Sequence, residues 1–482
     1  YDPWGTRIDQ IEVDPAWTRL IEIGIESGLV AIPYEMSFGE SSRVLQFGLQ
    51  HIFMPVSAVA DCPLSMTDAA ARVLLNEDID LARRYVPRLT ARRNAWTSGQ
   101  WMTEKQGGSD VGRSGTTATH VDGKTWQLHG TKWFNSATTA DIALALARPV
   151  GAEQTSRGLS LFLLELRNAD GSWNGIQVRR LKEKLGTRAV PTAELDLDGC
   201  LATQVGEIGR GVPKIATMLN ITRVHAAFGG NSPVGQGLSL ARDYAKKREA
   251  FGQKLIDLSV HRRWLGQIAA VYEAGLVLCF RAAQLLGATE VDSSQDDLAR
   301  VVFPLAKMAA ARQGVWGCSQ IVESFGGVGY LEDSGIPRLL RDVHVQCIWE
   351  GTTSIMALDV VRALGRNGVA EAFLDDVESK LRSYEHPLTA DSVRAISDAL
   401  DELRRMLADI DEADARRLAW AMARIYQAAL LAEAAGWALD KHADRRSASA
   451  LGLFIGQGLI DAPMDLSEQD LHELATGGLH IG

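Results

Sequence analysis

The 482-residue sequence predicts an α+β protein in which a central β domain lies between helical domains. Three observations predict this order. Residues 1–97 contain helical stretches without strand alternation, residues 98–205 carry short alternating strand patterns, and a helical period returns after residue 206 and persists. Because strands and helices do not alternate along the chain, the order disfavours a parallel Rossmann-type sheet.

The first helical domain is expected over residues 1–97. Thr67-Asp68, followed by an alanine-rich apolar run, is typical of a helix N-terminus. The chain begins at Tyr1 rather than Met, and its first residues resemble the interior of a domain. We therefore expect this domain to begin before Tyr1, which leaves open whether a targeting segment precedes it.

The β domain is expected over residues 98–205, where apolar residues alternate and Gly, Asn and Asp separate the runs. Asp122-Gly123 between two such runs predicts a tight β-hairpin. The predicted strands are Thr116–His120, Thr125–Leu128, Ile142–Ala147, Leu159–Leu166, Gly175–Arg180 and Ala193–Leu197. Together they indicate a mostly β domain of about one hundred residues.

A helical bundle is expected over residues 206–366. Apolar residues recur there at spacings of three and four. The segments with this spacing are Ile215–Gly229, Val234–Lys247, Val260–Leu286 and Asp297–Ser324. The Val260–Leu286 segment is apolar nearly all round, so we expect it to be buried in the bundle or in a subunit interface.

Residues 367–482 are expected to form an extra, acidic helical domain, with helices near residues 371–407 and 412–443. From Glu371 onward there are 11 Lys and Arg against 21 Asp and Glu, a net formal charge of −10. The whole chain also carries −10, so the part before residue 371 is neutral overall. An acidic surface repels polyphosphates, which makes nucleic-acid binding by this domain unfavourable.

The composition limits the class of protein further. Apolar residues make up 46% and charged residues 23%, which is typical of a soluble globular chain, and no run of 18 apolar residues predicts membrane insertion. The five cysteines are widely spread, without a C-x-x-C pair, which favours a reducing, cytoplasmic location over a disulfide framework. The ten histidines show no H-x-x-x-H spacing, so no metal site is expected.

Two segments of the β domain have the character of a ligand site. Gly107-Gly108-Ser109 allows backbone N–H groups to approach a ligand closely, although a glycine pair also marks ordinary turns. Trp133 stands beside the short polar side chains of Asn135 and Ser136, where the indole is either a cofactor platform or part of the core.

Three segments of the bundle carry further candidates. Arg248 at a helix end can pair with a diphosphate, or can simply favour the helix C-terminus. Gly326-Gly327 follows a helix rather than a strand, which argues against a dinucleotide fingerprint. Glu350 is a lone carboxylate in an apolar run, where burial would raise its pKa and make it a better base, while capping or a salt bridge is the structural alternative.

The order and spacing of these segments resemble the acyl-CoA dehydrogenase family, over roughly residues 95–366. The matching motifs are Met102-Thr103-Glu104, Gly108-Ser109-Asp110, Lys132-Trp133, Arg248-x-x-Phe251-Gly252, Phe325-Gly326-Gly327-x-Gly329-Tyr330, Arg341-Asp342 and Glu350-Gly351-Thr352. Cys62–Thr67, Met102–Val111 and Ile348–Gly351 look most like the AidB branch, which also has an extra C-terminal helical domain.

The resemblance implies an FAD-dependent fold of N-terminal helical domain, β-barrel domain and C-terminal helical bundle. Its expected cofactor-binding residues are Met102, Thr103, Gly108, Ser109, Trp133, Asn135, Ser136, Arg248, Phe251, Gly326, Gly327 and Thr352. Arg248 and Phe251 would reach the FAD of a neighbouring subunit. The expected substrate-binding residues are Ser109, Asn220, Arg223, Gly351 and Arg362.

The resemblance also implies the reaction. Glu350 would remove the α proton of an acyl-CoA thioester while the β hydride passes to the flavin N5. Electrons would leave to an external acceptor such as an electron-transfer flavoprotein, in a homotetramer acting in fatty acid metabolism. Two departures bear on the flavin contacts: Asn135-Ser136 replaces the usual Ile-Thr, and Glu323 replaces a common Gln.

Two alternatives remain at this point. One is an AidB-like, DNA-associated flavoprotein with weak or vestigial dehydrogenase activity, which salt-dependent duplex binding would support and the acidic region disfavours. The other is an oxidase of the same fold that uses Asp as base, such as nitroalkane oxidase, which Glu350 disfavours and an oxygen-uptake assay would decide.

Overall fold

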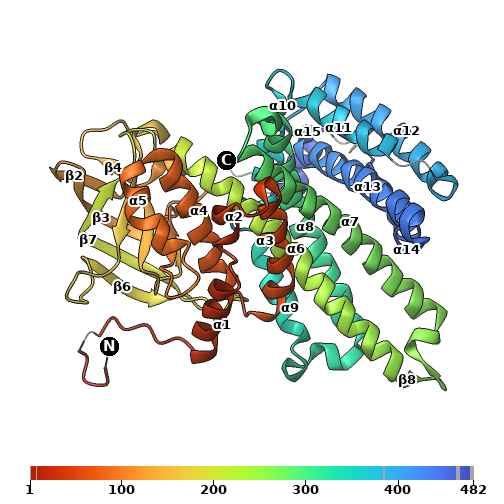
Figure 1. Ribbon diagram of the computed structural model, residues 1–482, viewed down its shortest axis with the longest axis horizontal. Coiled ribbons are helices and arrows are strands. Elements are labelled where there is room, and N and C mark those ends of the chain that lie inside the picture. The colour runs from red at the N-terminus through yellow and green to blue at the C-terminus, as the bar shows by residue number, and fades with distance from the viewer. Residues whose placement is uncertain (1, 7, 384–385, 463–466, 478–482) are drawn as a thin grey trace.

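The computed structural model describes residues 2–6, 8–383, 386–462 and 467–477. Figure 1 shows a β domain at one end, N-terminal helices beside it, and long helices that extend away from it. A further set of helices near the C-terminus packs along the upper side of these long helices (Figure 1). The predicted α+β architecture is confirmed.

The N-terminal helices pack against both the sheet and the bundle. They are α1 Pro15–Glu26, α2 Ile32–Glu35, α3 Ser42–Phe53, α4 Asp61–Glu77 and α5 Ile79–Leu89. The expected helix start at Thr67 is wrong, because α4 begins at Asp61. Thr67 lies inside the helix, where its hydroxyl donates to the backbone carbonyl of Pro63, four residues earlier. The side chain therefore bonds to its own helix and does not cap a helix N-terminus.

The β domain is a closed sheet. Its strands are β1 Ser98–Trp101, β2 Thr117–Asp122, β3 Thr125–Ser136, β4 Ile142–Pro149, β5 Ser160–Glu165, β6 Ile176–Leu181 and β7 Thr192–Gln204. The order β4-β2-β3-β7-β5 closes through β4–β5 pairing, while β1 pairs with β4 and β6 with β7. The predicted hairpin is present as β2–β3, but its turn residues are Gly123 and Lys124, because Asp122 is the last residue of β2 and lies opposite Thr125. Strand β1 was not predicted, because four residues are too few to show alternation.

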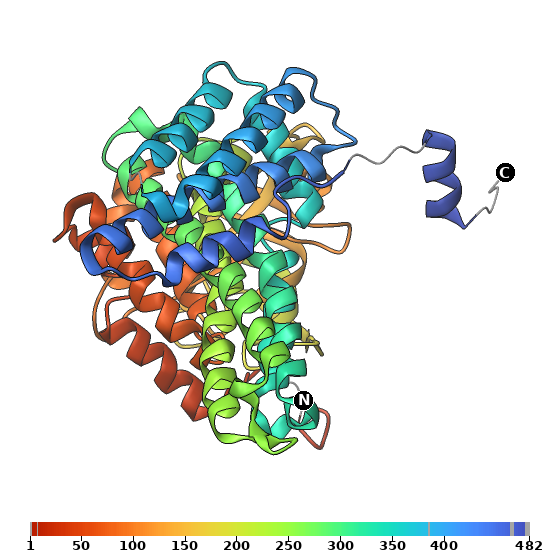
Figure 2. The same ribbon diagram turned by 90° about the vertical axis from the view of Figure 1, so that its right-hand side faces the viewer.

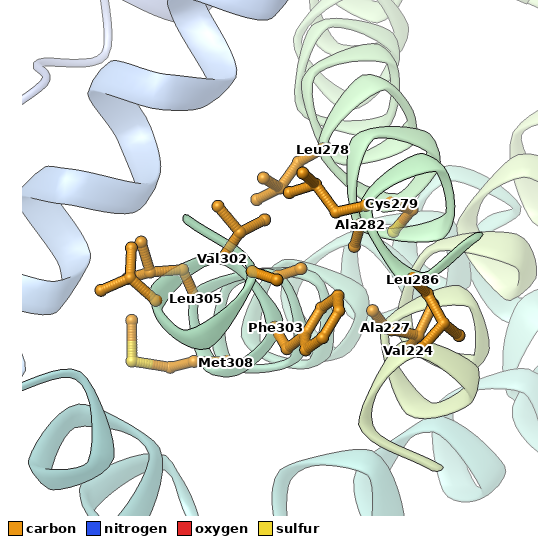
Figure 3. Packing of buried hydrophobic residues seen from close by; sticks show 14 of the residues in the cluster. Val224, Ala227, Leu278, Cys279, Ala282, Leu286, Val302, Phe303, Leu305 and Met308 are labelled. Atoms are coloured by element: carbon orange, nitrogen blue, oxygen red, sulfur yellow. The ribbon is translucent and has the colours of Figure 1, made fainter. Parts of the chain in front are cut away.

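The long helices form the bundle. They are α6 Gly211–Lys247, α7 Ser259–Thr289 and α8 Asp296–Ser324, followed by the shorter α9 Ile336–Val343 and α10 Thr353–Leu364. The two predicted segments up to Lys247 are one continuous helix, α6, which includes Pro233. Figure 3 shows Phe303 of α8 close to Val224 and Ala227 of α6 and Leu286 of α7, so the core of the bundle is apolar.

Helix α7 is, among the described helices, the one long and apolar enough to cross a membrane by length and composition. In the fold it packs against α6, α8 and α13. Within its most apolar stretch 56% of the residues are buried, which fits the bundle position expected from the sequence.

The C-terminal helices are α11 Val369–Ser383, α12 Ala390–Ala408, α13 Ala415–His442, α14 Arg446–Ile455 and α15 Glu468–Thr476. Helix α13 is buried on one side against α7, α8 and α10 (Figures 1 and 2). Figure 2 shows α15 apart from the other helices. Helix α10 begins three residues after Glu350, and α13 packs against α10. The C-terminal helices therefore support the helix that follows the predicted base.

A buried polar network joins the N-terminal helices to the bundle. Asp68 of α4 accepts hydrogen bonds from Arg43 at 2.7 Å and from His225 of α6 at 2.9 Å. Arg43 also pairs with Glu290, which receives a second cation, Arg72, at 3.0 Å. Each charge in this network has an oppositely charged partner, which is the condition for burying charges without a large penalty.

Candidate active site

Glu350 lies in a tight turn between the short helix His344–Cys347 and α10. Its φ is 58°, a left-handed conformation that a non-glycine residue adopts at a cost. Gly351 follows with a φ of 107°, and a Cβ there would lie 2.5 Å from Met356 Cε. The Thr352 hydroxyl accepts from the Ile355 N–H and caps α10. The turn therefore needs a glycine after Glu350, and it fixes the direction of that side chain.

The carboxyl of Glu350 is held by neutral donors. The Thr222 hydroxyl of α6 donates to it at 2.7 Å, and the Gln100 side chain of β1 also hydrogen-bonds to it. Burial raises the pKa of Glu350, and Thr222, Arg223 and Lys307 oppose that rise only in part. A carboxylate with a raised pKa is a stronger base than an exposed one.

The backbone carbonyls of the same turn meet two cations. Arg223 Nε approaches the Glu350 carbonyl at 3.5 Å, and Lys307 of α8 donates to the Gly351 carbonyl. Arg223 is also paired with Asp359 of α10 at 2.6 Å. The turn is thus fixed from α6, α8 and α10 together.

Asp359 links both predicted substrate-side arginines. Its second oxygen pairs at 3.0 Å with Arg362, whose side chain is mostly exposed. Asn220 lies half-buried on α6, close in sequence to Arg223. The fold therefore brings Arg223 and Gly351 to Glu350, while Arg362 lies farther out, behind Asp359.

A second group lies on the β domain. The Thr103 carbonyl accepts from the Trp133 N–H at 3.0 Å, so the segment after β1 is bound to β3 beside the indole. A Cβ on Gly108 would lie 2.9 Å from Thr103 Oγ1, so the chain folds back closely at this point. Met102 is buried and Ser109 is exposed.

A buried ion pair fixes this segment. Glu104 pairs at 2.8 Å with Lys132, and it also accepts from the hydroxyl of Thr116. Burial alone would raise the pKa of Glu104, but Lys132 and these hydrogen bonds lower it. Glu104 and Lys132 of the matching motifs are therefore structural anchors, and they place Thr103 and Trp133 without facing a ligand themselves.

Some buried polar atoms near Trp133 and Glu350 have no hydrogen-bond partner among the described residues. The Lys182 ammonium lies 3.4 Å from the centre of the indole ring. Ser136 hydrogen-bonds to Thr192 at 3.2 Å, whereas the buried oxygen of the Asn135 amide has no hydrogen-bond partner among the described residues. The Gln100 amide oxygen, next to Glu350, is also buried and unpaired within the described chain. Both groups therefore offer a free acceptor.

The β domain and the bundle are joined next to these groups. Asp342 of α9 accepts from the Thr187 N–H at 2.6 Å, and a Cβ on Gly186 would lie 2.3 Å from the Arg341 carbonyl. Trp349 packs against an apolar cluster that includes Ala137 and Ala140 of the β domain. Glu350 therefore follows a residue that is packed against the domain carrying Trp133.

The remaining predicted residues lie elsewhere in the chain. Arg248 is the exposed C-cap of α6, and Phe251, 94% exposed, sits in the hairpin of β8 (Glu249–Ala250) and β9 (Gln253–Lys254). Figure 1 places β8 at the end of the bundle far from the sheet. Gly326 and Gly327 lie exposed in the loop after α8. These residues do not join the Glu350 group within one chain.

Three residues at the site were not predicted from the sequence: Gln100, Thr222 and Lys307. The sequence could have pointed to Lys307, because it is a lone cation in the apolar run from Phe303 to Ala311. Burying a lysine in such a run is unfavourable unless its ammonium group has a partner. Thr222 and Gln100 carried no such signal, because a hydroxyl or an amide is common on any helix or strand.

Four family models match the chain. Residues 1–94 match the adaptive response protein AidB N-terminal domain, and residues 99–200 match the acyl-CoA dehydrogenase middle domain. Residues 209–365 match the acyl-CoA dehydrogenase C-terminal domain, and residues 368–462 match the acyl-CoA dehydrogenase 11 C-terminal domain-like model.

Individual proteins match over most of the chain. Acyl-CoA dehydrogenase family member 11 of Caenorhabditis elegans is 42% identical over 89% of this chain and 74% of its own length. AidB of Escherichia coli strain K12 is 32% identical over 78% of this chain and 71% of its own. The crystal structure of C. elegans ACDH-11 in complex with C11-CoA superposes with a TM-score of 0.94 and 38% identity, over 99% of this chain and 86% of that one. An acyl-CoA dehydrogenase complexed with FAD from Bacillus anthracis shares the fold, with a TM-score of 0.78 and 18% identity over 96% of this chain and 85% of that one.

Proposed function

The chain belongs to the acyl-CoA dehydrogenase family and is an enzyme, and from this we propose that it dehydrogenates an acyl-CoA thioester with Glu350 as base. The observation that carries this proposal is the carboxyl of Glu350. Burial raises its pKa, and the described residues that hydrogen-bond to it, Thr222 and Gln100, are neutral. A carboxylate bonded directly to a cation would be a weaker base.

The residues of the β domain and of the turn fit FAD as the cofactor. A flavin has hydroxyl and ring N–H donors, and the unpaired amide oxygens of Asn135 and Gln100 are acceptors for such groups. A Cβ on Gly108 would lie 2.9 Å from Thr103 Oγ1, so the chain comes close to Thr103 at a position where a larger side chain would not fit. When bound, FAD supplies the acceptor for the hydride that leaves the β carbon.

The turn at Glu350 also supplies the electrophilic side of the reaction. Removal of the α proton places negative charge on the thioester carbonyl oxygen, which a backbone N–H can stabilise. We assign this donor to the N–H of Glu350. Because Arg223 and Lys307 fix the carbonyls of Glu350 and Gly351, the same turn holds the base and the donor in one orientation.

We further propose that the site is completed by a second copy of the chain. Arg248 and Phe251 are exposed beside strand β8, at the far end of the bundle, where a second chain can reach both side chains. In the proposed homotetramer these residues contact the FAD of a neighbour, with Arg248 at its diphosphate. We propose an electron-transfer flavoprotein as the electron acceptor. We also propose that the protein acts in fatty acid metabolism in the cytoplasm.

Arg248→Ala is expected to weaken flavin binding about tenfold or more, since a hydrogen bond to a charged group contributes about 1.5–3 kcal/mol. The measurement is flavin absorbance per chain after gel filtration, over a series of protein concentrations. Arg242→Ala removes another exposed arginine from the same helix and serves as the control. Equal flavin content in both variants would contradict the role assigned to Arg248.

The test of the function is anaerobic titration of the purified protein with short, branched and long acyl-CoA thioesters. At least one thioester is expected to bleach the visible flavin absorbance and to form the 2-enoyl product. A flavin that no thioester in such a panel reduces would refute the proposal. The AidB-like alternative draws support from the match of residues 1–94, and salt-dependent duplex DNA binding without bleaching would favour it.

A further inference from the structure

Lys307 is a buried ammonium beside the proposed base. It lies in the middle of α8 with 0% of its surface exposed, and its hydrogen bond goes to the carbonyl of Gly351, the residue after Glu350. An ammonium in such a position loses its hydration, and one carbonyl replaces only part of it. The residue therefore needs a further source of stabilisation.

The surroundings of Lys307 offer one counter-charge. The described residues give it no salt bridge, whereas its neighbour Arg223 is neutralised by Asp359 at 2.6 Å. The largest attraction that Lys307 experiences comes from the carboxylate of Glu350. Burial lowers the pKa of Lys307 to about 8, and Glu350 opposes that decrease.

The other titratable groups near Glu350 do not replace this pair. Cys62 of α4 and Cys347 of the preceding short helix are thiols whose pKa burial raises, so both are neutral. Arg312 of α8 interacts with Cys347, and Arg223 is already paired. Of the two cations whose charges act on Glu350, Arg223 is paired with a carboxylate, whereas Lys307 has no salt bridge among the described residues.

We propose that Lys307 is a positioning residue for Glu350, which fixes the turn through the Gly351 carbonyl and keeps Glu350 ionised through its charge. This rests on the proposed function, since it concerns the form of Glu350 that accepts the α proton. Burial raises the pKa of Glu350 and so favours its protonated form, which cannot act as a base. A cation held out of direct contact lowers that pKa without forming an ion pair with the carboxylate that must accept the proton.

The test compares Lys307→Met and Lys307→Gln with the wild type. Met replaces the charge by an apolar chain of similar length, which buried sites accept readily. Gln keeps a donor for the Gly351 carbonyl and removes only the charge. Lys214→Met is the control, because Lys214 is also buried and also donates to two backbone carbonyls, Val205 at 2.8 Å and Glu207 at 2.7 Å, without Glu350 among its charge partners.

Two measurements are made on each variant. The first is the pH profile of kcat/KM, and the second is an infrared titration of the Glu350 carboxyl, taken as the difference from the same protein carrying Glu350→Gln. Both Lys307 variants are expected to raise the titration midpoint of Glu350 by about one pH unit. At pH values below that midpoint, this shift lowers the fraction of ionised Glu350 about tenfold. Lys214→Met is expected to leave the midpoint in place.

An unchanged titration midpoint of Glu350 in Lys307→Gln would overturn the proposal. A loss of activity that is equal at every pH, without a shift of that midpoint, is the result expected of a purely structural lysine. The infrared midpoint does not depend on turnover. If no thioester reduced the wild-type flavin, the proposed function would fail, while the midpoints would still decide whether Lys307 controls the ionisation of Glu350.

Discussion

Glu350→Gln is expected to lower kcat for acyl-CoA oxidation by about 10²–10⁴-fold, the contribution of a positioned general base. The amide has the shape of the carboxyl and still accepts from the Thr222 hydroxyl, so the turn and the fold are expected to persist. What the variant loses is the ability to accept the α proton. The measurement is turnover with an external electron acceptor, together with the anaerobic rate of flavin bleaching.

The pH dependence gives this prediction a second readout. Only ionised Glu350 accepts a proton, and its pKa is raised by burial. The wild-type kcat/KM is therefore expected to rise with pH through that raised pKa, and the residual rate of Glu350→Gln is expected to lack this limb. Glu371→Gln, an exposed change on α11, is the matched control. Wild-type turnover in Glu350→Gln would refute its role as base.

The largest loss of stability is expected from Asp68→Ala, at about 3–5 kcal/mol. Asp68 is 0% exposed, and its carboxylate is the common partner of Arg43 and His225. Its removal leaves buried Arg43 with Glu290 as its remaining carboxylate partner among the described residues, and it removes the carboxylate to which His225 hydrogen-bonds. Breaking a buried pair by deleting one member costs this much because an uncompensated charge remains. Chemical denaturation, followed by fluorescence, measures the difference.

The control for Asp68 is Asp80→Ala, because the Asp80–Arg83 pair is mostly exposed and such pairs contribute about 0–1 kcal/mol. The network also predicts the direction of acid sensitivity. Burial alone would raise the pKa of Asp68, but Arg43 and His225 hold it below its usual range, while burial lowers the pKa of His225. Both groups take up fewer protons folded than unfolded, so wild-type stability falls as pH drops below about 6.5 and again below about 4. A loss for Asp68→Ala no larger than that for Asp80→Ala would contradict this account.

Much of the fold followed from local patterns. Alternation located the strands of the β domain that are long enough to show it, and the 3.6-residue period located α7 and α8 within a few residues of their observed ends. The same patterns failed where local rules were overridden. Pro233 did not divide α6, since the helix is held by α7 and α8 on its buried side, and Thr67 did not begin α4.

The site was predicted less completely, and for a different reason. Motif order pointed to Trp133, Arg223, Glu350 and Gly351, and the structure places Arg223 against the Glu350 turn. Their roles in catalysis and cofactor binding stay predictions. The resemblance had assigned Arg248 and Phe251 to the FAD of a neighbouring subunit, and the structure adds that the adjoining strand β8 lies at the end of the bundle far from the sheet.

By itself, the sequence determined the family, the order of helical and β domains, and the carboxylate that stands as candidate base. Only the tertiary structure decided which groups surround that carboxylate: Gln100 from β1, Thr222 from α6 and Lys307 from α8. The physical reason is that periodicity and motif spacing report interactions along one element. Contacts between residues separated by tens to hundreds of positions depend on how elements pack, and the pKa of a buried group depends on those contacts.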